Sequence, residues 1–269
     1  MCKSIAALLL AVFSSLAAPT ETMPMNTPAL PPDFPVIEFR HYTLAAGERE
    51  DFVRRFETFF PAAFQQLGAL ALGQFTPRDE VDGFVWLRGF KSMEARGIAN
   101  ANFYYGPVWK EHAASLNAAL IDHTNVLLLR PLTPERGMAV LPAVDPVLEP
   151  EGAQGIAVAQ LFAVQAGQVD AFAAAAESRF AAYRAADARE MGVLVTLDAK
   201  NTFPQLSVRE DGPWLLWLGM VPSEAALQKK LLPLMRDATH FNSTLLRAAP
   251  ECLVLHPTAQ SRLRWLPAD

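Results

Sequence analysis

Cysteine is nearly absent from this sequence, which has only Cys2 and Cys252 among its 269 residues. If the N-terminal segment is removed, Cys252 stands alone and no intramolecular disulfide can form. The five histidines are isolated, with no HxxxH or HExxH pair, and there is no CxxC motif, so we expect no metal site. Glycine-rich nucleotide loops, the P-loop and the GxSxG elbow are also missing. The sequence therefore gives no reason to expect a cofactor.

Positive charge is scarce as well. Lys and Arg number 23 against 28 Asp and Glu, and the formal net charge is -5. Without an excess of basic residues or a long basic run, nucleic acid is excluded as an expected partner. The 51% hydrophobic and 19% charged residues are typical of a globular chain that buries a substantial core.

Long apolar runs are limited to the N-terminus, where Ile5 to Val12 follow Lys3 and precede small residues. This order is typical of a signal peptide, and the run is shorter than the roughly 20 residues that a membrane span needs. We expect residues 1–22 to be a leader, 23–34 to be an extended lead-in, and no membrane span to remain. The protein is then exported, periplasmic or secreted. The alternative is translation from Met23 or Met25 and a cytoplasmic protein.

Two stretches of the chain show the same order of elements. In the first, alternation and β-forming residues predict strands over 36–44, 69–77, 83–90 and 125–132, and helical spacing predicts helices over 49–68 and 92–120, the second interrupted near Gly106-Pro107. The order β-α-β-β-α-β is the ferredoxin-like pattern. Residues 42–57 align with 162–177, and 107–131 align with 233–257. We therefore predict two α+β domains, 35–132 and a divergent copy over 155–260, joined by a proline-rich linker over 133–154.

A ferredoxin-like sheet with helices on one face must bury its other face. Two such sheets in one chain satisfy this need by forming a pseudo-symmetric α/β barrel. The alternative is that each unit pairs with its copy in a second chain, as a homodimer.

The first copy resembles the NIPSNAP family, which belongs to the dimeric α/β-barrel superfamily. Residues 38–47, EFRHYTLAAG, are similar to the family's E-x-R-x-Y-T-L-x-x-G opening, and Tyr104, Pro107 and Trp109 match its Y-x-x-P-x-W. The resemblance covers residues 36–132, whereas the second copy lacks these motifs. It implies a fold more than an activity, because family members act as interaction or adaptor proteins and superfamily relatives include cofactor-free oxygenases and haem enzymes. His240 is the candidate axial ligand for a haem, but we do not expect the protein to bind haem.

Strand alternation places Glu38, Arg40 and Tyr42 on one face of the first strand. Because Ile37 and Phe39 suit the side that meets the helices, we expect the polar face to point into the barrel or toward a partner sheet. Trp86 and Arg88 share a face of the third strand, which neighbours the first, so Arg40 and Arg88 are expected to converge. Such a face suits a small aromatic or carboxylated molecule, and the alternative is a structural ion pair with sheet packing.

Seven residues are therefore candidates for ligand binding: Glu38, Arg40, Tyr42, Trp86, Arg88, Tyr104 and His112. The main hypothesis is a module that binds a small molecule or a protein partner on this face. A second is a cofactor-independent monooxygenase or isomerase in which Arg40 and Arg88 hold an anion and Tyr42 or His112 handles a proton. His123 is the other imidazole considered as a base. A third is an interaction scaffold that works through its outer helices. The sequence leaves open whether the protein is an enzyme.

Overall fold

The computed structural model describes residues 34–139, 141–237, 241 and 243–266. The expected leader, the lead-in up to residue 33 and His240 lie outside this part. None of the described helices is long and apolar enough to cross a membrane.

Both halves show the predicted order of elements. The first half contains β1 (Val36–Leu44), α1 (Arg49–Gln66), β2 (Ala69–Pro77), β3 (Gly83–Phe90), α2 (Met93–Tyr104), α3 (Pro107–Ala119) and β4 (Leu120–Pro131). The described part of the linker contains one short 3-10 helix, η1 (Pro134–Arg136). The second half contains β5 (Ile156–Ala163), α4 (Val169–Ala185), β6 (Arg189–Thr196), β7 (Trp214–Val221), α5 (Glu224–Ala226), η2 (Leu227–Leu231), α6 (Leu232–Arg236), η4 (Ser243–Leu245) and β8 (Glu251–Pro257).

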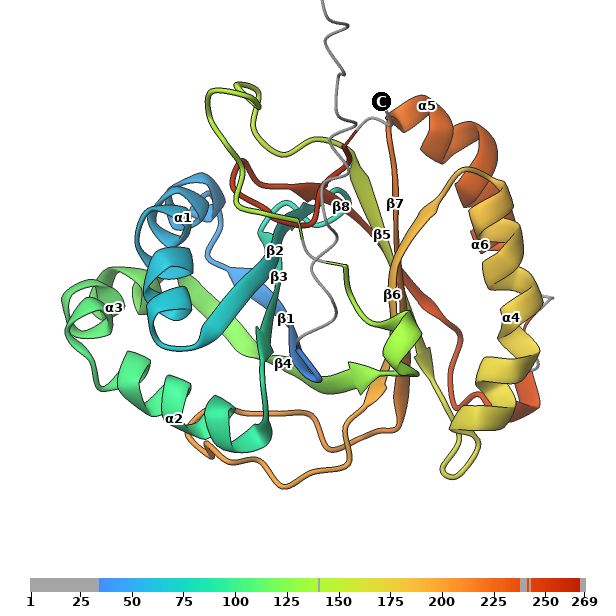
Figure 1. The fold of residues 1–269 in the computed structure, drawn as a ribbon, viewed down its shortest axis with the longest axis horizontal. Coiled ribbons are helices and arrows are strands. Elements are labelled where there is room, and N and C mark those ends of the chain that lie inside the picture. Colours follow the sequence, from blue (N-terminus) through green and yellow to red (C-terminus); the bar gives the residue numbers. More distant parts are fainter. Residues whose placement is uncertain (1–33, 140, 238–240, 242, 267–269) are drawn as a thin grey trace, which may run out of the picture.

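The strands close into one antiparallel barrel in the order β1-β3-β2-β8-β5-β7-β6-β4. Two seams join the halves, β2 with β8 and β4 with β6, and each seam has three paired residues. The first-half helices cover one side of the barrel and α4 to α6 cover the other (Figure 1). The predicted tandem α/β barrel within one chain is confirmed, and no second chain is needed to close it.

Local chemistry explains where the helices begin. The Ser92 hydroxyl accepts a hydrogen bond from the Ala95 N–H at 3.0 Å, and Ser223 accepts one from Ala226 at 3.3 Å in the second half. The break between α2 and α3 has a glycine at residue 106 because a Cβ there would lie 2.3 Å from the Asn102 carbonyl oxygen. Pro107 then starts α3 in the first turn, where its missing N–H costs nothing.

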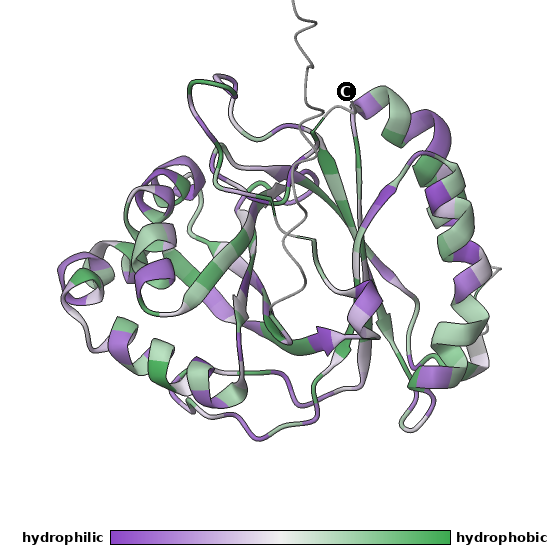
Figure 2. Cartoon of the chain, viewed as in Figure 1, coloured by the Kyte–Doolittle hydropathy of each residue, from purple (hydrophilic) through white to green (hydrophobic). Residues whose placement is uncertain are grey.

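The barrel interior is apolar and is built by both halves. Ile37, Phe39, Leu194 and Leu218 belong to this core, and the strands are mostly apolar along their length (Figure 2). The expectation that Ile37 and Phe39 face the helices is therefore wrong. Alternation determines which residues share a face, but here both faces are buried, and the barrel closes on the apolar one.

The second-half counterpart of α3 is shorter than the repeat predicted. The alignment of 107–131 with 233–257 predicted a matching helix, but α6 ends at Arg236 and Asp237 has left helical geometry. The chain then places Phe241 against Phe162, with ring centroids 4.8 Å apart. Phe241 is thereby buried in the second-half core.

A shared interior predicts that the two halves unfold together. Phe39→Ala in the first half and Leu218→Ala in the second should each lower the free energy of unfolding by about 3 to 5 kcal/mol, because each leaves a cavity in the same core. In urea denaturation followed by circular dichroism and by tryptophan fluorescence, both variants should show one coincident transition. Val81→Ala, at a side chain 74% exposed, should change stability by no more than about 0.5 kcal/mol. Two separate transitions would contradict the shared core.

Candidate functional site

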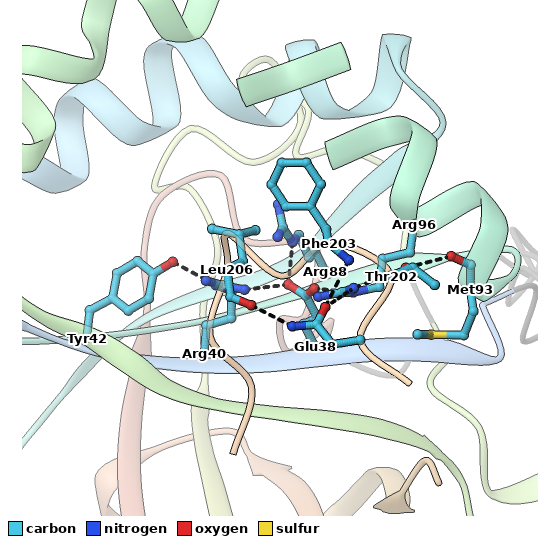
Figure 3. A network of polar contacts seen from close by, with 10 residues as sticks. Glu38, Arg40, Tyr42, Arg88, Met93, Arg96, Thr202, Phe203 and Leu206 are labelled. Atoms are coloured by element: carbon cyan, nitrogen blue, oxygen red, sulfur yellow. Dashed lines mark hydrogen bonds and ion pairs between the residues drawn. The ribbon is translucent and has the colours of Figure 1, made fainter. Parts of the chain in front are cut away.

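The carboxylate of Glu38 is the centre of a buried charge cluster between the first-half sheet and its helices. Arg40 Nη1 and Arg88 Nε each donate to Glu38 Oε2 at 2.6 Å, and Arg96 Nε donates to Oε1 at 2.6 Å. The side chains of all four residues are at most 1% exposed. Figure 3 shows them converging from β1, β3 and α2.

Strand register explains this convergence. Glu38 lies opposite Arg88, and Arg40 lies opposite Trp86, in the antiparallel pair β1–β3. The cap at Ser92 starts α2 so that Arg96, in the first turn, reaches back to the same carboxylate. Glu38, Arg40 and Tyr42 thus face the helices, opposite to the expected barrel side.

The cluster carries an excess of positive charge. Among the described residues, three guanidinium groups against one carboxylate leave two net positive charges in this buried cluster. Nη1 and Nη2 of Arg88 and Nη2 of Arg96 are buried and have no hydrogen-bond partner among the described residues. Aromatic rings offset part of this deficit, since the Arg88 guanidinium lies 5.1 Å from the Trp86 ring centroid and 5.4 Å from that of Phe64. Burial alone raises the pKa of Glu38, but the charges of Arg88, Arg40 and Arg96 outweigh it and hold the pKa far below its usual range.

Tyr42 extends the cluster toward a pocket. Arg40 Nε donates to the Tyr42 hydroxyl oxygen at 2.7 Å, which leaves the hydroxyl hydrogen to donate elsewhere. Burial raises the pKa of Tyr42, although the charge of Arg40 opposes this, so the hydroxyl stays protonated near neutral pH. Its ring meets Trp86 edge-on, with centroids 6.2 Å apart.

The pocket beside Tyr42 has a volume of about 390 Å³. Arg40 and Tyr42 line it on the sheet side, Tyr104 and Trp109 come from the helices, and His123 lies at the exposed end. A small apolar cavity of about 30 Å³ shares Tyr42, Tyr104 and Trp109 and is otherwise lined mainly by phenylalanines. A larger pocket of about 600 Å³ lies between α1, β2 and the linker, but none of the cluster residues lines it.

The structure brings together most of the candidate residues. Glu38, Arg40, Tyr42, Trp86 and Arg88 form one contact network, and Tyr104 joins it with its ring 6.0 Å from the Arg88 guanidinium.

His112 lies apart from this network. Its ring stacks on Phe59 at 3.7 Å, between α3 and α1, and it does not line the pocket. Trp109 and His112 lie one turn apart on the same side of α3, and both contact rings of α1, but only Trp109 also lines the pocket. The imidazole at the pocket is that of His123, whose ring centroid is 6.4 Å from that of Tyr42.

Two parts of the site were missed from sequence. One is Arg96, the third arginine on Glu38. The other is the segment over 197–213, between β6 and β7, which we call the strap; Phe203 and Leu206 from it line the pocket. The length of this segment was the available signal, since the equivalent connection in the first half spans only residues 78–82.

The second half shows that the fold does not need the cluster. At the positions equivalent to Glu38, Arg40, Arg88 and Arg96 it has, in that order, Val158, Gln160, Gly219 and Leu227. The Trp217 ring takes the space of a side chain at Gly219, since a Cβ there would lie 2.1 Å from it. Gln160 accepts a hydrogen bond from the Tyr183 hydroxyl at 3.0 Å. An uncharged core therefore fills the same place.

Fold and site together define a single-chain α/β barrel of two ferredoxin-like units. Among the described residues, the buried cluster around Glu38 belongs to the first unit and has no counterpart at the equivalent positions of the second. Residues 37–134 match the model of the NIPSNAP family. The resemblance predicted from the motifs is confirmed for this half, which contains all the cluster residues.

Solved structures support the whole barrel. A candidate monooxygenase from Lactobacillus acidophilus is 12% identical, with 85% of this chain and 97% of that one covered and a TM-score of 0.51. A candidate monooxygenase from Fusobacterium nucleatum subsp. nucleatum is 11% identical, with 87% and 99% covered and a TM-score of 0.53. An anthrone oxidase-like protein is 13% identical, with 87% and 96% covered and a TM-score of 0.53. These similarities establish the fold alone. No curated protein matches the sequence significantly.

The cluster makes stability depend on pH through Glu38. The pKa of Glu38 is lower in the folded protein than in the unfolded chain, where it is about 4.3. The stability that its charge contributes is therefore complete above the unfolded pKa and is lost as pH falls toward the folded pKa. Glu38→Gln should lower the free energy of unfolding at pH 7 by about 3 to 5 kcal/mol, because three arginines lose their buried counter-ion. Urea denaturation at pH 7, 5 and 3 should show that the difference in unfolding free energy between Glu38→Gln and the wild type becomes smaller as pH falls. A difference that stays constant from pH 7 to 3 would contradict this assignment.

Proposed function

We propose that the first-half pocket binds a small organic anion with a flat aromatic body. The observation that carries the proposal is the uncompensated charge of the cluster, together with its absence from the second half. A purely structural ion network is expected to be close to neutral, because unpaired buried charge is costly. Two net positive charges beside a pocket are instead suited to an anionic ligand.

Arg40 is the group best placed to meet that anion. It lines the pocket, and its Nη1 and Nε are already oriented by Glu38 and Tyr42. A guanidinium held in this way recognises a carboxylate with little further loss of side-chain freedom. The protonated Tyr42 hydroxyl supplies a second donor at the same end of the pocket.

The pocket walls favour an aromatic body. Tyr104, Trp109 and Phe203 contribute rings, and the volume of about 390 Å³ lies within the range of small-molecule sites, roughly 300 to 1,000 Å³. Ring stacking adds to burial of apolar area in such a site. A protein partner is less suited to this location, because Glu38 and its arginines are buried.

The cellular compartment of the protein determines where it binds its ligand. If residues 1–22 direct export, as we propose, the ligand is taken from outside the cytoplasm.

The proposal predicts selectivity for the charged form of an aromatic probe. By isothermal titration calorimetry at pH 7, the wild type should bind 2-naphthoate at least about tenfold more tightly than the neutral 2-naphthamide, since a charge-assisted contact contributes about 1.5 to 3 kcal/mol. Arg40→Met should weaken 2-naphthoate binding by a similar factor. Gln160→Met, at the matched position of the second half, should leave it unchanged. Equal affinity for the acid and the amide would reject the proposal.

A second candidate function is proton transfer on an enolisable ligand. The observation that favours it is the grouping of the Tyr42 hydroxyl, the Arg40 guanidinium and the His123 imidazole at one pocket. Arg40 and Tyr42 would stabilise a developing oxyanion, and His123 would accept the proton. This is the isomerase form of the enzyme hypothesis.

Solvent exchange tests this second candidate. In deuterium oxide, the wild type should speed deuterium incorporation at the carbon next to the carbonyl of 2-tetralone, measured by proton NMR. His123→Gln should abolish the acceleration, whereas His112→Gln, at the imidazole stacked on Phe59, should retain it. No acceleration by the wild type would leave the protein as a binding module.

A further inference from the structure

The strap is much longer than the equivalent connection between strands in the first half. In the first half, residues 78–82 join β2 to β3 as a short turn, whereas residues 197–213 join β6 to β7. Figure 1 shows the strap, in orange, leaving the second half and running beneath α2 of the first. A hairpin does not need a connection of this length.

Both ends of the strap are fastened to β4. The Leu197 N–H donates to the Leu128 carbonyl at 2.9 Å, and the Arg209 N–H donates to the Val126 carbonyl at 2.8 Å. Arg209 Nη1 also donates to Asn125 Oδ1 at 3.1 Å. The strap is therefore held along the strand next to the pocket.

The middle of the strap contacts the charge cluster directly. Arg96, which donates to Glu38 through Nε, donates through Nη1 to Asn201 Oδ1 at 2.9 Å and to the Thr202 hydroxyl at 3.3 Å. Thr202 in turn donates to the Met93 carbonyl at 3.0 Å. One guanidinium thus links the carboxylate at the centre of the site to the segment that covers it (Figure 3).

Asn201 also shapes the strap so that two apolar side chains point inward. Its Oδ1 accepts from the Phe203 N–H at 3.0 Å, and its Nδ2 donates to the Leu206 carbonyl at 2.8 Å. Phe203 is 6% and Leu206 8% exposed, although the strap lies at the surface. The Phe203 ring stacks near Tyr104, with centroids 5.8 Å apart and planes 25° from parallel.

We propose that the strap is the specificity element of the pocket, in which Phe203 and Leu206 set the size of the aromatic body that the site accepts. The inference rests on the proposed function, because it assumes an aromatic anion in the pocket. The equivalent site of the second half is filled by Trp217 and its neighbours. The second half instead contributes the strap as a wall of the first-half pocket. Arg96 and Asn201 position the wall relative to the anion-binding end.

The test compares a small and a large aromatic carboxylate, benzoate and anthracene-2-carboxylate, by isothermal titration calorimetry. Phe203→Ala removes a ring from the pocket wall, so the ratio of affinities should shift by at least about tenfold toward the larger probe, as expected for an altered apolar contact. Glu210→Ala, at an exposed strap residue that does not line the pocket, should leave the ratio unchanged.

Phe203→Leu is a second variant for the case in which Phe203→Ala does not fold, because it keeps an apolar side chain at this position. It should shift the ratio of affinities in the same direction by a smaller factor. If both Phe203 variants bind the probes with the wild-type ratio, the strap is only a structural cover and the inference is wrong. If the wild type binds neither probe, the proposed function fails, and the inference fails with it.

Discussion

The carboxylate of Glu38 is the contact on which the first half of this protein depends. It accepts hydrogen bonds from three buried arginines of β1, β3 and α2, and through Arg96 it is linked to a strap that belongs to the other half. A buried carboxylate with this many cationic partners is stable only in its charged form. The Glu38 carboxylate therefore connects the β1–β3 strand pair, the first turn of α2 and, through Arg96, the strap.

The duplicated units have diverged in a way that separates structure from function. Both contribute to an apolar barrel interior, as the mixed composition of that core shows. Outside the barrel, the second unit places Trp217 and Leu227 where the first has arginines, and gains tight packing without charge. The first unit has a costly excess of positive charge instead, and this cost is the basis of the binding role that we propose for its pocket.

Much of the fold was accessible from sequence because its signals are local or repeated. Alternation and helical spacing located the elements of the first unit, and the internal repeat extended their order to the second unit and indicated two sheets that bury each other's open faces. The motif around Glu38 and Tyr42 correctly identified which half resembles NIPSNAP. The order of strands also placed Arg40 and Arg88 near one carboxylate, since neighbouring strands share a register.

What the sequence by itself determined is which side chains share a face: Glu38, Arg40 and Tyr42 on one side of β1, and Ile37 and Phe39 on the other. Only the tertiary structure decided that the charged face lies under the helices. Both faces are buried, and alternation shows which residues share a face but not which face meets the helices. The tertiary structure also decided that the strap, far along the chain, closes the pocket, and that His123 rather than His112 lies beside Tyr42. Such contacts depend on how distant segments close around the barrel, and no local period in the sequence records that.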